Sequence, residues 1–219
     1  MEVHKISNLL YLWFLFNSPL LNGSISMRKL FILILLSITS KSMAQKDDYF
    51  YQIPEAPETY TSGHILARLI DGVGFRYYWA TYELTDAEMD YKPGNDTRTT
   101  LETLQHIEGL TGISRNAFLG EPTDFSTRVL SDNLNDSRAN TLNHLKEASL
   151  YLRSHELTPN QQKMIFQSSA GSREYPIWNL INGPISDALW HIGQVVSFRR
   201  SAGNPFPNGV NVLLGSKKD

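Results

Sequence analysis

The stretch PISDALWHIGQVVSFRRSAG, from Pro184 to Gly203, decides the fold, because it has the marks of a helix at both ends. Proline suits the first helical position, where its missing N–H is not needed and its φ is already preset. Arg199 and Arg200 stand in the last turn, where cations interact favourably with the negative end of the helix dipole. Gly203 offers a left-handed exit, and Pro205 cannot continue the helix. The pattern therefore predicts a helix over 184–203.

Most side chains of this predicted helix are apolar, which is typical of a helix that is buried on most faces. One polar stripe runs through it, because Asp187, His191 and Gln194 are spaced i, i+4 and i+7 and so lie on one face. A carboxylate and an imidazole one turn apart on such a helix can reach the same metal ion. The alternative is that Asp187 and His191 form an ordinary i,i+4 pair on the solvent side.

The composition is that of a globular protein, and it excludes several kinds of site. The 219 residues favour one domain, and 41% hydrophobic residues are enough to build a core. The chain has no cysteine, which excludes disulfides, thiolate metal sites and cysteine nucleophiles. Any metal must therefore be held by His, Asp or Glu.

Charge is distributed unevenly along the chain. Residues 1–44 hold four basic side chains and one acidic one, which leaves sixteen basic and twenty-one acidic side chains in the remainder. Such a mildly acidic body lacks the basic patch that binds nucleic acid. Nucleic acid is therefore excluded as a partner.

Residues 27–44 have the layout of a secretory signal peptide. Basic residues follow Met27, an apolar run covers 30–38, and a small-x-small pattern ends at Ala44, after which we expect cleavage. This run and another over 9–16 are each shorter than the roughly 20 residues that span a bilayer. A signal peptide works best at the true N-terminus, so Met27 is interpreted as the start; the alternative is that 1–44 form one leader. Either way, we expect an exported protein, periplasmic or extracellular, without a membrane span in its mature form.

The rest of the chain predicts an all-α fold. An extended arm over 45–61 is followed by apolar residues at helical spacing, and 207–219 form a tail. Thr99 and Glu102 fit a capping box at the start of one helix. The segment 158–181 is predicted to hold turns and loops without strands. Four helices over 62–206 predict a bundle, with ranges 62–82, 99–118, 138–155 and 184–203.

Two of these segments resemble a known family. Residues 99–109, TTLETLQHIEG, are similar to the second helix of the DinB-like superfamily of metal-dependent four-helix bundles. Residues 187–205, DALWHIGQVVSFRRSAGNP, resemble its fourth-helix pattern, H-x-x-x-H-x-G-Q followed by a hydrophobic stretch, Arg and Gly. The resemblance covers most of 62–206. It implies a DinB-like bundle in which His106 and His191 are the first and third metal ligands.

The chain departs from the family at the second ligand, where Asp187 replaces the usual histidine. Two histidines and one carboxylate can still hold a divalent metal (Zn, Ni, Fe or Mn) and leave positions open for water or substrate. The carboxylate lowers the net charge of the site and favours harder metals or non-haem iron. Gln194 is a candidate for orienting a ligand or the bound water; alternatively, it bonds the helix backbone. The competing hypothesis is a decayed site in which Asp187 and His191 are merely hydrogen-bonded.

The resemblance implies several activities. Characterised members of the family include thiol-dependent S-transferases and an isomerase, but an exported protein would lack the reduced thiol pool. Metal-assisted hydrolysis needs no such cosubstrate. The chain contains no glycine-rich phosphate loop, no H-E-x-x-H and no G-x-S-x-G.

Two functions remain open at this point. The leading hypothesis is an exported metal-dependent hydrolase or transferase that acts on an unidentified small molecule. The alternative is a non-catalytic bundle that binds a small ligand or forms a homodimer. Structural roles are predicted for four further residues: Trp178 and Trp190 as core or pocket wall, and His144 and His155 as exposed side chains.

Overall fold

The computed structural model describes residues 49–158 and 162–218. Contacts divide the chain into two units, Met1–Asp48 and Tyr49–Asp219. The predicted leader, with its start at Met27 and its cleavage after Ala44, lies outside the described residues. Within the described part, no helix is both long and apolar enough to cross a membrane.

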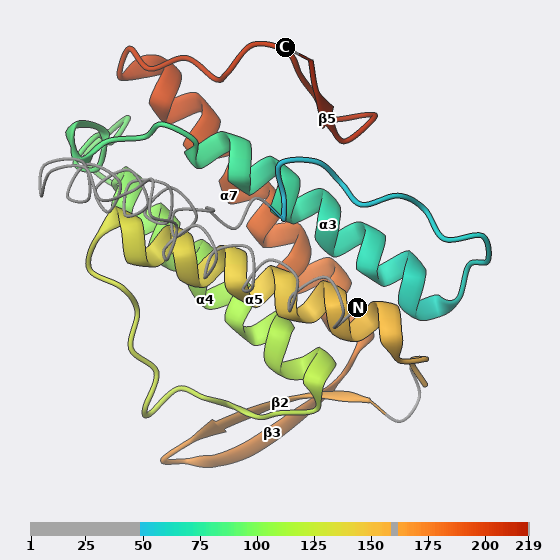
Figure 1. The fold of residues 1–219 in the computed structure, drawn as a ribbon. Helices are drawn as coiled ribbons and strands as arrows, with labels where there is room; N and C mark the ends of the chain where they lie inside the picture. Colours follow the sequence, from blue (N-terminus) through green and yellow to red (C-terminus); the bar gives the residue numbers. More distant parts are fainter. Residues whose placement is uncertain (1–48, 159–161, 219) are drawn as a thin grey trace, which may run out of the picture. The chain divides into compact units, whose positions relative to one another are not determined.

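The described residues contain four long helices that form a bundle (Figure 1). Helix α5 packs against α3 and α4, and α7 contacts the same two helices. The predicted four-helix bundle is therefore confirmed. The helices are α3 Ser62–Thr81, α4 Thr100–Leu119, α5 Leu134–Ser154 and α7 Ser186–Ser201.

The core lies between these helices and follows the helical spacing that the sequence predicts. Each helix contributes side chains that are almost fully buried. They include Phe75, Tyr77 and Trp79 of α3, Leu104 and Ile107 of α4, Leu145 and Leu152 of α5, and Ile192 and Val195 of α7.

Capping explains where two of the helices begin. The Thr99 hydroxyl accepts a hydrogen bond from the Glu102 amide, and the Glu102 carboxylate accepts one from the Thr99 amide, so the predicted capping box is present. Helix α5 begins one turn before the predicted Arg138. The reason is Asn133, whose side chain accepts a hydrogen bond from the Asp136 amide and caps the helix there.

The last helix has an earlier and less regular entry than the predicted start at Pro184. Helical backbone begins with the short α6, Trp178–Leu180, and continues through a π-helical turn, η3, Ile181–Ile185. Gly183 has non-helical dihedral angles (φ −98°, ψ −109°) and forms a kink at this point. Because Pro184 has no N–H to donate, the regular helix resumes only at Ser186.

The expectation of an all-α chain is wrong for the segment before α6, where a β-hairpin forms. Strands β2, Lys163–Ser168, and β3, Gly171–Pro176, pair antiparallel, and β1, Thr123–Asp124, pairs parallel with β2. In Figure 1 the hairpin lies at the end of α4. The ring of Phe166 packs against Phe125 and Tyr175 (centroid distances 5.1 and 5.5 Å). Contacts from outside the segment therefore stabilise strands that its own polar sequence does not predict.

The predicted arm and tail pack against the bundle and against each other. In the described part of the arm, Phe50 is buried against α3, and the Tyr51 carbonyl accepts a hydrogen bond from the Trp79 indole. The tail contains a small hairpin of β4, Val210–Asn211, and β5, Ser216–Lys217. The Ile53 amide donates to the Gly215 carbonyl between the strands (2.8 Å), which joins arm and tail.

Arg199 is not the simple dipole partner at the end of its own helix that the sequence suggests. Its side chain is buried and donates hydrogen bonds to the carbonyls of Trp79 and Ala80 (3.1 and 2.9 Å). These carbonyls belong to the last turn of α3, where no further helical N–H is available. Arg199 therefore caps α3 from α7, and Asn204 accepts hydrogen bonds from its Nε and Nη2 atoms.

Candidate metal centre

The structure brings the three predicted ligands together from two helices. His106 lies in the second turn of α4, and Asp187 and His191 lie one turn apart on α7. The two helices are in contact, so residues 81 positions apart in sequence become neighbours. One ligand atom from each of the three side chains lies within 4.8 Å of the others.

The Asp187 carboxylate lies between the two imidazoles. Its Oδ2 atom is 3.2 Å from Nε2 of His106, and its Oδ1 atom is 3.2 Å from Nε2 of His191. The two rings stand edge to face, with centroids 4.6 Å apart. The side chains of His106 and Asp187 are 31% and 38% exposed, against 12% for His191. The site is therefore open to solvent on the side of His106 and Asp187.

Gln194 determines which nitrogen of His191 faces the site. Nδ1 of His191 is 2.7 Å from Oε1 of Gln194, so Nδ1–H donates to this oxygen. In the neutral ring the lone pair is then on Nε2, and it faces Oδ1 of Asp187. A cation between this nitrogen and this oxygen satisfies both, as does a proton on Nε2. The contact places Gln194 beside a predicted ligand, and its role in orienting that ligand stays a prediction.

His106 is kept in the form that can bind a metal. Its partial burial lowers the pKa below the ordinary value of 6.5, and the hydrogen bond to Asp187 opposes this shift. The charges of Arg98 and His191 lower the pKa further. His106 is therefore neutral at neutral pH, with a lone pair available for coordination.

The donor set fits a divalent cation. Two imidazole nitrogens and one carboxylate oxygen suit zinc, iron, nickel or manganese and leave coordination positions free. Ligand atoms that bind one ion at about 2.1 Å lie no more than about 4.2 Å apart. The ligand atoms of the three side chains lie up to 4.8 Å apart, so the most distant two must move slightly closer to bind one ion. The side chains of His106 and Asp187 are about a third exposed and have room for this movement.

Two tryptophans differ from their predicted positions. Trp178 and Trp190 are 61% and 72% exposed, whereas the sequence predicts core or pocket wall. The apolar residues of α7 face the bundle through Ala188, Ile192 and Val195, and Trp190 falls on the opposite side. Helix α7 is thus buried along one stripe and exposed along another.

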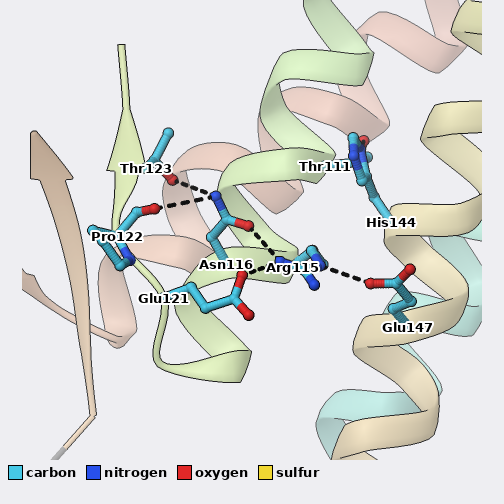
Figure 2. A network of polar contacts seen from close by, with 8 residues as sticks. All are labelled: Thr111, Arg115, Asn116, Glu121, Pro122, Thr123, His144 and Glu147. Carbon is cyan, nitrogen blue, oxygen red and sulfur yellow. Dashed lines mark hydrogen bonds and ion pairs between the residues drawn. The ribbon is translucent and has the colours of Figure 1, made fainter. Parts of the chain in front are cut away.

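Figure 2 shows a second polar cluster, which includes His144 and contains none of the three predicted ligands. Nε of Arg115 donates to Glu147 of α5 (2.7 Å), and Arg115 also pairs with Glu121 after α4. His144 lies 3.4 Å from the Thr111 hydroxyl, and partial burial lowers its pKa. The prediction of an exposed His144 is therefore wrong. These contacts join α4 to α5 and to the loop that follows α4.

His155 is exposed, as predicted. It lies just after α5 and stacks on the ring of Tyr151, with centroids 4.0 Å apart. Neither His144 nor His155 has a carboxylate or a second histidine arranged with it as a metal group in the described part of the chain.

We expect Gln194→Leu to weaken metal binding about 10- to 100-fold, the usual cost of removing a residue that orients a ligand. The apolar side chain leaves Nδ1–H of His191 without its acceptor, so the lone pair no longer stays on Nε2. Gln194→Glu keeps an acceptor at this position and serves as the matched control, with affinity close to that of the wild type. Competition with a chromophoric chelator measures both variants, and equal affinities would contradict the orienting role.

Comparison with known proteins gives one structural likeness. No family model matches the chain, and no curated protein matches it. Among solved structures, YfiT from Bacillus subtilis is similar, and it is described as a probable metal-dependent hydrolase with an unusual four-helix bundle topology. The match has 16% identity and a TM-score of 0.48, and it covers 71% of this chain and 98% of YfiT. At this level of similarity, the argument for a metal site rests on the residues of this chain.

Proposed function

We propose that this protein is a metal-dependent hydrolase whose divalent cation is held by His106, Asp187 and His191. The convergence of these three ligand atoms within 4.8 Å, at a position open to solvent, is the observation that carries the proposal. Hydrogen bonds of the partly exposed His106 and Asp187 contribute at most about 1 kcal/mol to stability, so stability alone does not account for this arrangement.

When bound, a divalent cation supplies Lewis acidity, which polarises a carbonyl or phosphoryl oxygen and makes water a stronger acid. The residues of the chain provide the rest. His106 and His191 offer lone pairs, Asp187 offsets one positive charge, and Gln194 keeps the His191 ring in place. The exposed side of the site admits substrate and water.

Hydrolysis is favoured over thiol transfer because it needs water as its sole co-reactant. The bond between the acyl or phosphoryl centre and its leaving group breaks, a bond to the water oxygen forms, and the leaving group takes up a proton. The proposal includes export, which rests on the signal-peptide layout of residues 27–44. Outside the cytoplasm, reduced low-molecular-weight thiols are scarce, so a thiol-dependent reaction would lack its cosubstrate.

Metal content and hydrolysis together test the proposal. Elemental mass spectrometry of the purified protein should find close to one divalent metal per chain, which His106→Ala and His191→Ala lose. A panel of p-nitrophenyl carboxylic and phosphate esters should be hydrolysed by the metal-loaded protein, and much more slowly after chelation or in either variant. Metal affinity should be constant above the lowered pKa of His106 and fall as the pH drops below it, because protons then compete for the lone pair.

Two results would contradict the proposal in different ways. Protein that takes up no zinc, nickel, manganese or iron has no metal site, and Asp187 then only bridges two histidines. Protein that binds metal but hydrolyses none of the esters or phosphates is not a hydrolase of these classes, and a binding module becomes the better description.

A further inference from the structure

We propose that this site takes a substrate with a carboxylate or phosphate group, and that Arg128 binds this group. The inference deepens the proposed function and rests on it. Arg128 lies in the loop 120–133, which joins α4 to α5. Two features of the structure place its guanidinium near the predicted ligands: the course of this loop along α4, and the contacts that hold the side chain.

The loop runs back along α4 toward the turn that carries His106. Near its start, the Thr123 hydroxyl accepts a hydrogen bond from Nδ2 of Asn116 (3.3 Å). Near its end, the Ser131 carbonyl accepts one from Nε2 of Gln105 (2.8 Å), the residue directly before His106. Between these two anchors the loop follows α4 for about three turns. Side chains in the middle of the loop therefore reach the part of α4 just after His106.

Two contacts hold the Arg128 guanidinium against α4. One is with Gly109, which is buried, because a Cβ atom there would lie 3.0 Å from Nη1 and 3.4 Å from Nη2 of Arg128. The other is with Phe125, whose ring centroid is 5.1 Å from Cζ of Arg128, a distance that suits a cation–π interaction. Phe125 in turn packs against Phe166 of the β2–β3 hairpin. A glycine of α4 and the hairpin thus fix the position of this arginine.

The contact with Gly109 places the guanidinium near His106. The two residues are three positions apart on α4, so they are neighbours on the helix surface, with Cβ positions about 5–6 Å apart. Together with the contact distance, this puts the Arg128 guanidinium within about 9 Å of the Cβ atom of His106. A substrate whose anionic group is several bonds away from the bond to be hydrolysed can span that distance.

The Arg128 guanidinium is exposed and has no hydrogen bond or ion pair within residues 49–158 and 162–218. Glu108 directly precedes Gly109, but its carboxylate accepts hydrogen bonds from Ser131 and Asn140 instead. A planar guanidinium matches a carboxylate or phosphate through two parallel hydrogen bonds. An arginine that is held in place with its N–H groups unused is therefore ready to bind such an anion.

Glutarate and its monoamide, glutaramate, are suitable probes, because both offer one carboxylate to the metal and differ in the charge of the other end. We would titrate each by calorimetry into the zinc-loaded full-length protein, with the zinc content measured before and after. Glutarate should bind at least tenfold more tightly than glutaramate. Arg128→Gln should remove most of this preference, whereas Arg128→Lys, which keeps the charge without the planar pair of donors, should retain part of it.

Arg200→Gln is the matched control for the loss of one exposed charge. Arg200 is exposed in the last turn of α7, about 20 Å along the helix from Asp187. Its removal should leave the preference for glutarate unchanged.

Gly109→Ala tests the position of the guanidinium separately from its charge. The three atoms nearest to the added methyl group all belong to Arg128, the closest at 3.0 Å, so the guanidinium has to move away. The preference for glutarate should then fall although the charge is still present. Alanine is a better helix former than glycine, so the variant should fold and keep its zinc.

The outcomes separate this inference from the proposed function. An Arg128→Gln or Gly109→Ala protein that keeps its zinc and the full preference for glutarate would overturn the placement of Arg128 at the site. Wild-type protein that holds zinc but binds the two probes equally would overturn the inference and leave the proposed hydrolase standing. Protein that takes up no metal would overturn both.

Discussion

Replacing Asp187 with alanine is expected to lower the affinity for a divalent cation about 100- to 1000-fold. Small zinc sites contribute roughly 10–16 kcal/mol from four ligands, so one ligand is worth about 2.5–4 kcal/mol. Asp187 is also the carboxylate that both histidines contact, at 3.2 Å each. Its loss therefore removes a ligand and the negative charge that balances the cation. Equilibrium competition with a chromophoric chelator measures the change directly.

Two further substitutions separate the parts of this effect. Asp187→Asn keeps the shape and one oxygen but removes the charge, so its affinity should fall between wild type and Asp187→Ala. Asp187→His supplies the donor that the DinB-like pattern usually has at this position. It should bind metal well but shift the preference away from manganese and toward zinc and nickel, because imidazole is a softer ligand than carboxylate.

The alternative of a decayed site predicts a different pattern. If Asp187 and His191 are only a hydrogen-bonded pair, all four proteins should bind metal weakly and to the same extent. The substitutions would then change stability by no more than about 1 kcal/mol, since the Asp187 side chain is 38% exposed.

The long helices could be predicted from sequence because local signals and burial agree. Apolar residues recur every three to four positions, and caps such as Thr99 with Glu102 are local in sequence. Asp187, His191 and Gln194 could be recognised for the same reason, since each lies about one helix turn from the next. His106 lies 81 residues from Asp187, so no local pattern connects them. The family resemblance supplied that link, and the contact between α4 and α7 accounts for it physically.

The features that sequence did not predict depend on distant contacts. The β2–β3 hairpin is mostly exposed and polar, and its Phe166 packs against Phe125, about forty residues earlier. The buried Arg199 looked like a residue that complements its own helix dipole, whereas its hydrogen-bond acceptors belong to α3. The exposure of Trp190 depends on which stripe of a largely apolar helix faces the bundle. Composition alone does not determine that choice.

Arg153→Met is expected to lower the free energy of unfolding by about 3–5 kcal/mol, the largest loss of stability that we predict. Asp71 of α3 is fully buried, accepts a hydrogen bond from Ser149 (2.6 Å), and pairs with Arg153 of α5. Methionine replaces much of the length of arginine but leaves the carboxylate buried without a counter-charge. Urea unfolding followed by circular dichroism measures the loss, which should appear as a lower midpoint with an unchanged slope.

Two controls assign this loss to the buried charge. The double variant Asp71→Leu with Arg153→Met removes both charges and should recover a large part of the stability, because replacing a whole buried pair with apolar residues is often close to neutral. Lys163→Met breaks an ion pair with Glu174 in which both side chains are about half exposed, and should cost less than about 1 kcal/mol. If Arg153→Met costs no more than Lys163→Met, the Asp71–Arg153 pair does not hold α3 against α5. The apolar contacts between these two helices would then account for their association.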